Sequence, residues 1–121
     1  MPQTQTIPNT RLTGTQTFTF GNSQTGDSNA LVTIDRTITG GLNSLTTADT
    51  LTIAIYRSFD GGTTWEPNPK AAITCVGGTI VVKGVTMSQE QLAVGIDDVT
   101  DFEVVTTASK AVRIAGTVVY S

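Results

Sequence analysis

The stretch LTIAIYRSFDGGTTW, residues 51–65, contains a predicted β-strand followed at once by a predicted tight turn. In its first part, Leu51, Ile53 and Ile55 alternate with smaller or more polar residues, and this period of two is expected when one face of a strand is buried. Clusters of Gly, Asn, Asp and Ser separate the segments that show the same alternation, which are 12–20, 30–39, 79–85, 101–107 and 111–120. Because no helical period lies between them, they predict a single all-β domain, an antiparallel β-sandwich with a jelly-roll-like arrangement.

The composition supports this fold class. About a fifth of the 121 residues are Thr, and Thr, Val and Ile have β-branched side chains that fit a pleated sheet. Charged residues make up 14% and hydrophobic residues 38%, a balance too apolar for a disordered chain. A chain of this length can bury a core without disulfides or metals. The best candidate for a helical turn is TMSQEQLA, residues 86–93.

The buried faces of these strands predict the core. The last segment is expected to lie centrally in a sheet, with Gly116 at a point where a neighbouring strand packs close. The predicted core residues are Phe18, Phe20, Val32, Ile34, Ile38, Leu51, Ile53, Ile55, Ile80, Val82, Phe102, Val104, Val112, Ile114 and Val118.

Charge and cysteine content exclude several partners and environments. The net charge is −3, and the seven Lys and Arg residues are scattered singly, so we expect no nucleic-acid partner. No apolar run is long enough for a membrane span, and the first residues lack the pattern of a signal peptide, so we expect no membrane partner. The single Cys75 lies in an apolar segment and is expected to be buried and unreactive. These features favour synthesis in a reducing cytoplasm.

The first eleven residues, MPQTQTIPNTR, differ from the rest. Pro2 and Pro8 lack the backbone N–H that a strand in the middle of a sheet requires. We therefore expect an extended N-terminal arm over residues 1–11 and a β-sandwich domain over 12–121. Either the arm is a frayed terminus, or it crosses to a neighbouring subunit with Ile7 as its anchor. In the second case the partner-binding residues are Pro2, Ile7, Pro8 and Arg11.

Residues that carry catalysis are scarce. The chain has no His, so Ser/His and Cys/His pairs and imidazole metal ligands are absent, and one Cys cannot form a structural zinc site. The densest carboxylates are the pairs Asp97/Asp98 and Asp101/Glu103. These are the right groups for an acid/base pair or a Ca²⁺ site, but a solvated loop before a strand explains them more simply. We therefore expect that the protein is not an enzyme and that it has no catalytic residues, no cofactor and no bound metal.

The turn SFDGGTTW, residues 58–65, is the most specific motif in the chain. Two glycines after Asp60 supply the positive φ values of a tight turn, and the side chains of Ser58 and Asp60 can bond to its backbone. Its spacing resembles the Asp-box hairpin of sialidase-type β-propellers at Ser58, Asp60, Gly62, Thr64 and Trp65. In those families the hairpin lies away from the catalytic site, so the resemblance implies turn geometry and no activity.

A second, broader resemblance concerns the whole chain. A strand running into SxDGGTTW, a remainder rich in Thr and Val, and the final strand VRIAGTVVY are similar to small β-sandwich proteins of tailed-phage virions. These include head decoration, or cement, proteins. The resemblance implies a structural virion protein on the capsid exterior, often a homotrimer, that binds the major capsid protein and bridges its subunits.

An alternative function is a carbohydrate-binding or adhesin-type module of a phage fibre, tail or head surface. Such sites present aromatic faces to sugar rings, and Tyr56, Phe59 and Trp65 are close enough in sequence to form one patch. The simpler interpretation of Trp65 is that its indole packs on the hairpin.

Overall fold

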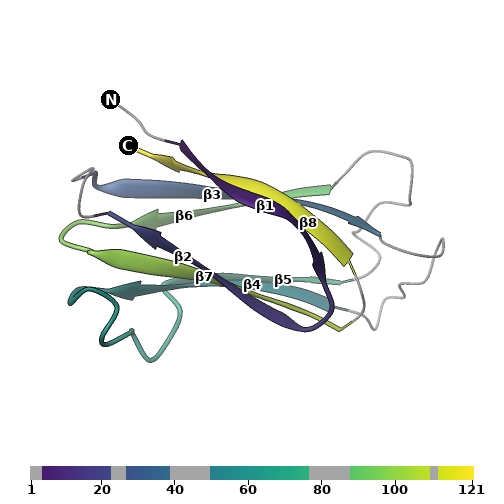
Figure 1. Ribbon diagram of the computed structural model, residues 1–121, viewed down its shortest axis with the longest axis horizontal. Helices are drawn as coiled ribbons and strands as arrows, with labels where there is room; N and C mark the ends of the chain where they lie inside the picture. The colour runs from purple at the N-terminus through teal and green to yellow at the C-terminus, as the bar shows by residue number, and fades with distance from the viewer. Residues whose placement is uncertain (1–3, 23–26, 39–49, 77–87, 110–111) are drawn as a thin grey trace.

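The computed structural model describes residues 4–22, 27–38, 50–76, 88–109 and 112–121 (Figure 1). The described residues form two antiparallel sheets of four strands, in the orders β1-β8-β3-β6 (sheet A) and β2-β7-β4-β5 (sheet B). The predicted all-β antiparallel sandwich is therefore confirmed. No helix in the described part has the length and hydrophobicity to cross a membrane. The strands are β1 Thr4–Leu12, β2 Thr15–Gly21, β3 Asn29–Ile38, β4 Thr50–Ser58, β5 Ala71–Val76, β6 Ser88–Gly95, β7 Asp101–Ala108 and β8 Val112–Tyr120.

Strands β2, β4 and β6 all finish at the same end of the sandwich, on the left in Figure 1. We call this end, which contains residues 58–65 and 96–100, the hairpin end. Asn22 joins two of its loops, because the side-chain amide donates to the carbonyl oxygens of Asp27, Ile96 and Val99 at 3.1–3.2 Å. Its own N–H donates to Thr100 O at 2.8 Å. These bonds give the hairpin end a fixed backbone frame.

The expected arm over residues 1–11 is corrected by its described part. From Thr4 onward the chain forms β1, which pairs with β8 in sheet A, and Ile7 is fully buried in the core of its own chain. Pro8 is accommodated because β1 is an edge strand whose register shifts between Ile7 and Thr10. The described residues of this segment therefore form no strand in the middle of a sheet, as predicted. They belong to the sandwich domain, however, and do not form the separate arm that was predicted.

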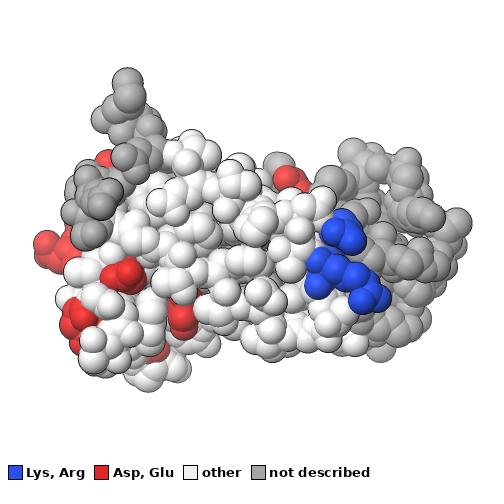
Figure 2. All heavy atoms as spheres, in the orientation of Figure 1, with Lys and Arg blue, Asp and Glu red and all other residues white. Residues whose placement is uncertain are grey.

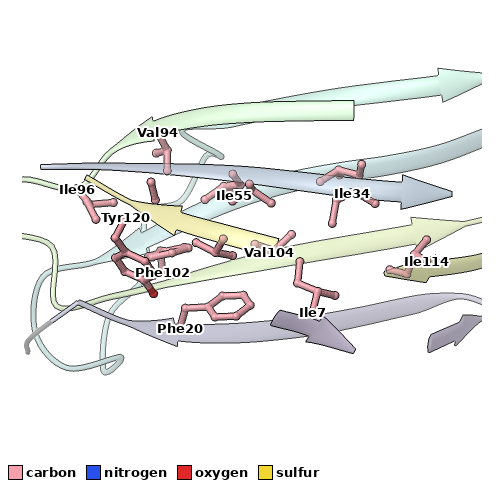
Figure 3. Packing of buried hydrophobic residues seen from close by; sticks show 14 of the residues in the cluster. Ile7, Phe20, Ile34, Ile55, Val94, Ile96, Phe102, Val104, Ile114 and Tyr120 are labelled. Atoms are coloured by element: carbon pink, nitrogen blue, oxygen red, sulfur yellow. The ribbon is translucent and has the colours of Figure 1, made fainter. Parts of the chain in front are cut away.

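The core lies between the two sheets, and Ile7 of β1 points into it (Figure 3). Phe102 stacks on Phe20, with ring centroids 5.5 Å apart, and also contacts Tyr120 at 5.9 Å. The predicted core residues that are buried are Phe20, Val32, Ile34, Leu51, Ile53, Ile55, Phe102, Val104, Ile114 and Val118, with Phe18 half-buried against them. Additional core residues are Ile7, Leu12, Ala30, Val94, Ile96, Val99, Ala108 and Tyr120. The side chains of Ile38 and Val112, and residues Ile80 and Val82, lie outside what the structure describes.

Two local predictions fall in strands. The helical turn expected at 86–93 is wrong for its described residues, because 88–93 belong to β6 and pair with β3. There Leu92 and Val94 face the core while Gln91 and Ala93 are exposed, so burial along a strand outweighs the helix propensity of the sequence. Cys75 pairs with Leu51 through its backbone in β5, and its side chain lies outside the described part.

The close approach predicted at Gly116 is present in the structure. This residue lies in β8, between Ile7 of β1 and Ile34 of β3. A Cβ atom at this position would overlap the carbonyl oxygen of Thr33, which is backbone and cannot turn aside. Gly116 therefore sets how closely β3 and β8 pack.

Tyr120 makes stability depend on pH in the alkaline range. Its hydroxyl donates to Gly21 O at 3.0 Å, and burial, followed by the charge of Asp27, raises the pKa of Tyr120 from 10.0 to about 12. The folded state therefore retains the Tyr120 proton between these pH values while the unfolded chain loses it. We expect the free energy of unfolding to be fully maintained below pH 10 and to fall as the pH rises towards 12. Denaturant titrations across this range should show a smaller loss for Tyr120→Phe than for the wild type.

Candidate functional site

The hairpin at residues 58–65 is held by the side chains of Ser58 and Asp60. Ser58 Oγ is fully buried, donates to Asp60 Oδ1 at 2.8 Å and accepts from Gly62 N at 2.9 Å. Asp60 Oδ1 also accepts from Thr64 N at 2.8 Å. Gly61 and Gly62 have φ values of 75° and 89°, which glycine adopts without strain. The turn is therefore fixed by bonds between near neighbours in the sequence.

Thr100, from the loop after β6, links the hairpin to the β6–β7 loop through hydrogen bonds. Its hydroxyl donates to Ser58 O at 3.2 Å and accepts from Gly61 N at 2.8 Å, while its own N–H donates to Ser58 O at 3.0 Å. An isolated bridge between Ser58 and Trp65 closes the base of the turn. The indole ring covers the turn, since a Cβ at Gly62 would lie 3.6 Å from Trp65 Cζ2.

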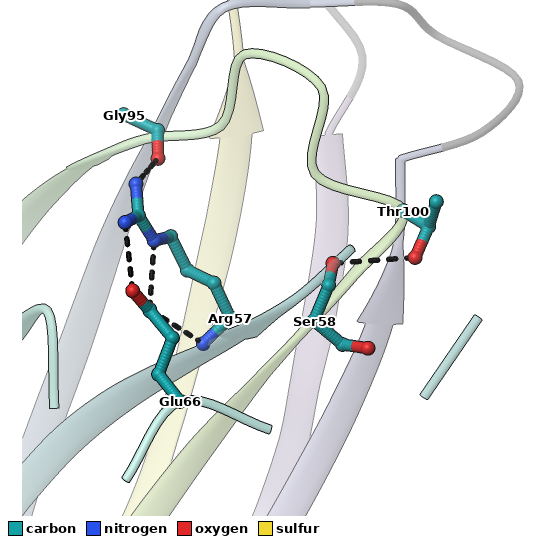
Figure 4. A network of polar contacts seen from close by, with 5 residues as sticks. All are labelled: Arg57, Ser58, Glu66, Gly95 and Thr100. Atoms are coloured by element: carbon teal, nitrogen blue, oxygen red, sulfur yellow. Dashed lines mark hydrogen bonds and ion pairs between the residues drawn. The ribbon is translucent and has the colours of Figure 1, made fainter. Parts of the chain in front are cut away.

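Arg57 and Glu66 flank the hairpin, and Arg57 connects the two sheets (Figure 4). Arg57 Nε and Nη2 donate to Glu66 Oε1 and Oε2, both at 2.8 Å, and Arg57 Nη1 donates to Gly95 O of β6 at 3.0 Å. Because Arg57 lies in sheet B and Gly95 in sheet A, the guanidinium joins one sheet to the other. It also lies 5.3 Å from the centroid of the Phe59 ring, within the range of a cation–π contact.

Beside this ion pair is an open hollow of about 350 Å³ with mainly apolar walls. Phe59 contributes the most accessible large apolar surface, with half of its side chain exposed. The hollow is lined by Arg57, Phe59, Asp60, Thr64, Trp65, Glu66 and Pro67. A hollow of this composition can hold a small, partly apolar ligand such as a sugar ring.

The three predicted aromatic residues do not form one patch. Phe59 and Trp65 line the hollow, whereas Tyr56 does not. Tyr56 follows the fully buried Ile55 in β4, so it points to the outer face of sheet B, where it pairs with Glu103.

The carboxylates of the site are engaged in structural bonds. The backbone N–H of Thr64, and then the Ser58 hydroxyl, lower the pKa of Asp60, and the bond from Arg57 lowers the pKa of Glu66. Both carboxylates therefore contribute stability at neutral pH, and this contribution is lost as the pH falls below 3.8 and 4.5 towards the lowered values. Neither has the raised pKa that suits a general acid.

The other carboxylates predicted as candidates lie elsewhere at the hairpin end. Asp97 and Asp98 are exposed in the β6–β7 turn, where Asp98 has a positive φ of 61°, and Asp101 and Glu103 lie on β7. Among the described residues, no group of three or more Asp, Glu, Cys or His side chains is arranged to hold a metal ion. Of the predicted partner-binding residues, Ile7 is in the core, Pro8 and Arg11 are exposed on β1, and Pro2 lies outside the described part.

Short side chains form two rows on the outer face of sheet B. One row across its four strands consists of Thr15, Thr107, Thr52 and Thr74, and the next of Thr17, Val105, Ala54 and Ala72. The hydroxyls of Thr15 and Thr107 lie 3.1 Å apart. These two adjacent rows, which we call the threonine face, contain no charged residue.

The side-chain bonds of Ser58 and Asp60 within the hairpin, which we call the hairpin brace, predict the effect of Ser58→Ala. The substitution removes the acceptor of Gly62 N and the hydroxyl that donates to Asp60, so it should lower the free energy of unfolding by about 1–3 kcal/mol. Chemical denaturation measures this change. The exposed neighbouring variant Thr63→Ala should remain within about 0.5 kcal/mol of the wild type, and equal losses for both variants would show that the brace contributes nothing specific.

Neither a protein-family model nor a curated protein sequence matches this chain. Its fold, however, is found in solved structures. The SPBc2 prophage-derived protein YomS superposes with a TM-score of 0.51 at 10% identity, over 98% of this chain and 95% of that one. The infectious bursal disease virus VP2 subviral particle gives 0.53 at 14% identity, over 98% of this chain and 32% of that one. The structure of the T13 particle of the same virus gives 0.50 at 14% identity, over 98% and 30%.

These similarities define the class of fold. The chain is a β-sandwich of a type that also occurs in a prophage-derived protein and in viral particle proteins, and it spans about a third of the VP2 chain. At such low identities the similarity concerns the fold alone.

Proposed function

We propose that the protein is a structural virion component, a head decoration or cement protein that binds the outer surface of a capsid and bridges major capsid protein subunits. The observation that carries the proposal is the match of nearly the whole chain to nearly the whole of a prophage-derived protein, together with the matches to viral particle proteins. The proposed location is the exterior of the virion, and the proposed role is structural and not enzymatic. Several copies would act together, and the resemblance to decoration proteins favours a trimer.

The threonine face is the surface that best fits a capsid contact. Its Thr, Ala and Val side chains have few rotatable bonds, so they lose little conformational entropy when an interface buries them. Two neighbouring rows without charge also avoid the cost of desolvating ionised groups. Pro8 and Arg11, exposed on β1, are further candidates for contacts made by the N-terminal segment.

Co-sedimentation with undecorated tailed-phage capsids tests the proposal. We expect the wild-type protein to pellet with capsids and to raise the temperature at which they break open. Thr74→Glu places a charge on the threonine face and should weaken this binding, whereas Gln91→Glu, at an equally exposed edge position of sheet A, should not. Failure of the wild type to bind any capsid would refute the function, and equal binding by both variants would refute only the choice of face.

The hollow beside the hairpin favours a second candidate function, a carbohydrate-binding or adhesin-type module. An exposed Phe59 ring and the neighbouring Trp65 offer apolar surface for a sugar ring, and polar groups surround them. A glycan array should then give signals that Trp65→Ala and Phe59→Ala abolish. Tyr56→Ala is the matched control, because this aromatic residue lies outside the hollow. An array without signals, or signals unchanged by all three substitutions, would eliminate this function.

A further inference from the structure

Strand β2 is an edge of sheet B that lacks the usual protection against pairing. Its sequence, TQTFTFG, has no charge and no proline, and its register with β7 is regular over the whole strand. The other edges differ: β1 contains Pro8 and a register shift, β6 carries Glu90, and the short β5 follows Pro69 and Lys70. Proline, charge and irregularity are the features with which edge strands prevent the addition of another strand. The β2 edge is therefore open to pairing.

The backbone groups that point out of this edge can be assigned from the register. Ala108 N donates to Gly14 O, and Asn22 N donates to Thr100 O, so even-numbered residues direct their N–H and C=O groups towards β7. Hydrogen bonding alternates along an antiparallel strand, so the odd-numbered residues direct theirs away from β7. The outward groups belong to Thr15, Thr17, Thr19 and Gly21, and of these the Gly21 carbonyl already accepts from the Tyr120 hydroxyl at 3.0 Å.

We propose that this edge binds the same edge of a second copy of the chain, with β2 antiparallel to β2 about a two-fold axis at Phe18. In this register Thr17 faces Thr19 of the second copy, and Thr15 faces Gly21 of the second copy. All four are odd-numbered residues, so both pairs fall at hydrogen-bonding positions. The Thr17–Thr19 pair, which occurs on both sides of the axis, carries the contact, because the Gly21 carbonyl already accepts from the Tyr120 hydroxyl. An edge that matches itself in this way requires no other partner, and the two sheets B become one continuous sheet.

The side chains of β2 agree with this register. Phe18 is half-buried in the single chain, and its counterpart in the second copy lies directly opposite in a non-hydrogen-bonded pair, where side chains approach most closely. The two rings would cover one another and complete their burial. Thr17 and Thr19 lie on the outer face, where short hydroxyl side chains pair without a steric clash.

The distribution of charge also favours the antiparallel arrangement. On the face in Figure 2, acidic side chains gather at the hairpin end and basic ones near the opposite end. The two-fold axis places the hairpin end of each copy beside the opposite end of the other, so unlike charges become neighbours. The separation is not complete: Asp35 and Glu90 lie in the half of sheet A away from the hairpin end, and Arg57 and Lys70 are basic residues at the hairpin end. The acidic residues of the hairpin end include Asp27, Asp60, Asp97, Asp98 and Asp101, and the basic residues near the other end include Arg11 and Arg113.

This contact is independent of the proposed function. It predicts a dimer of the free protein, whereas the resemblance to decoration proteins favours a trimer. Capsid binding and dimerisation are measured separately, so either proposal can fail while the other stands.

Sedimentation equilibrium over a series of protein concentrations tests the dimer. The wild type should show a reversible monomer–dimer equilibrium. In T17K/T19K each introduced side chain faces a like charge across the axis, whereas in T17K/T19E it faces an opposite charge. We therefore expect the dimer dissociation constant of T17K/T19K to exceed that of T17K/T19E by about tenfold. All substituted positions are exposed, and thermal unfolding of each variant shows that it is folded.

The matched control is Q91K/A93K, which adds two charges with the same spacing to the exposed face of edge strand β6. Its dissociation constant should equal that of the wild type. A wild-type protein that is monomeric at every concentration, or trimeric, would overturn the proposal. Equal dissociation constants for T17K/T19K and T17K/T19E would overturn the register about Phe18, and a weakened Q91K/A93K dimer would place the contact on another edge.

Discussion

Gly116→Ala is expected to lower the free energy of unfolding by about 3 kcal/mol or more. The added methyl group would overlap Thr33 O and lie within 3.1 Å of the carbon of that carbonyl and 3.3 Å of Ile34 Cα. These atoms are backbone, so a side-chain rotation cannot relieve the overlap. Strand β3 must move away from β8, and β8 is an inner strand that pairs with β1 on its other side. Equilibrium unfolding in denaturant measures the loss.

Two other glycines serve as controls for this prediction. A Cβ atom at Gly14 or at Gly95 would meet nothing within 4 Å, and neither residue has a positive φ. Gly14→Ala and Gly95→Ala should therefore change stability by no more than about 0.5 kcal/mol. If Gly116→Ala were as stable as these variants, β3 and β8 would not pack in solution as closely as described.

Ile7→Ala is expected to cost about 2–5 kcal/mol, the range for truncating a large aliphatic side chain in a core. Ile7 is fully buried and belongs to the same core cluster as Ile34 and Ile114. The exposed neighbour Thr6, altered to Ala, should have little effect. Chemical denaturation of both variants makes the comparison, and a loss below about 1 kcal/mol for Ile7→Ala would mean that β1 does not contribute to the core.

The same variant distinguishes a strand of the domain from an arm exchanged with a neighbour. If Ile7 is buried in its own chain, the loss of stability is independent of protein concentration. If it is buried in a neighbouring subunit, the loss varies with concentration, because unfolding then includes dissociation.

The sequence predicted the strands whose two faces differ clearly in polarity. In β4, β7 and β8 apolar residues occupy every second position, and the structure buries most of them. The sequence did not predict β1 and β6, where the alternation is interrupted, or β5, whose residues are mostly small. Pro8 concealed an edge strand, since an edge tolerates a missing N–H and a shift in register. In β6 good helix formers occupy exposed positions, and only pairing with β3 determines the conformation.

The site was predictable where its bonds are local. Ser58, Asp60 and the two glycines fix the turn through contacts over a few residues, which the spacing of the motif encodes. The contact of Arg57 with Gly95 spans 38 residues and depends on how the two sheets pack, so no local pattern encodes it. The Arg57–Glu66 ion pair could have been predicted, because a closed hairpin brings together the residues that precede and follow it. The contacts of Thr100 could not have been predicted, since its hydroxyl bonds to Ser58 and Gly61, which belong to a different loop.

The hairpin brace also bears on how such a turn spreads among proteins. Its side-chain bonds join residues no more than four positions apart, so these bonds require no residue from outside the eight-residue segment. A segment whose conformation is fixed by its own residues can be inherited, or can arise by chance in unrelated folds, without any associated activity. The presence of this motif in a sequence therefore indicates a way of reversing the chain and does not by itself indicate a ligand or an activity.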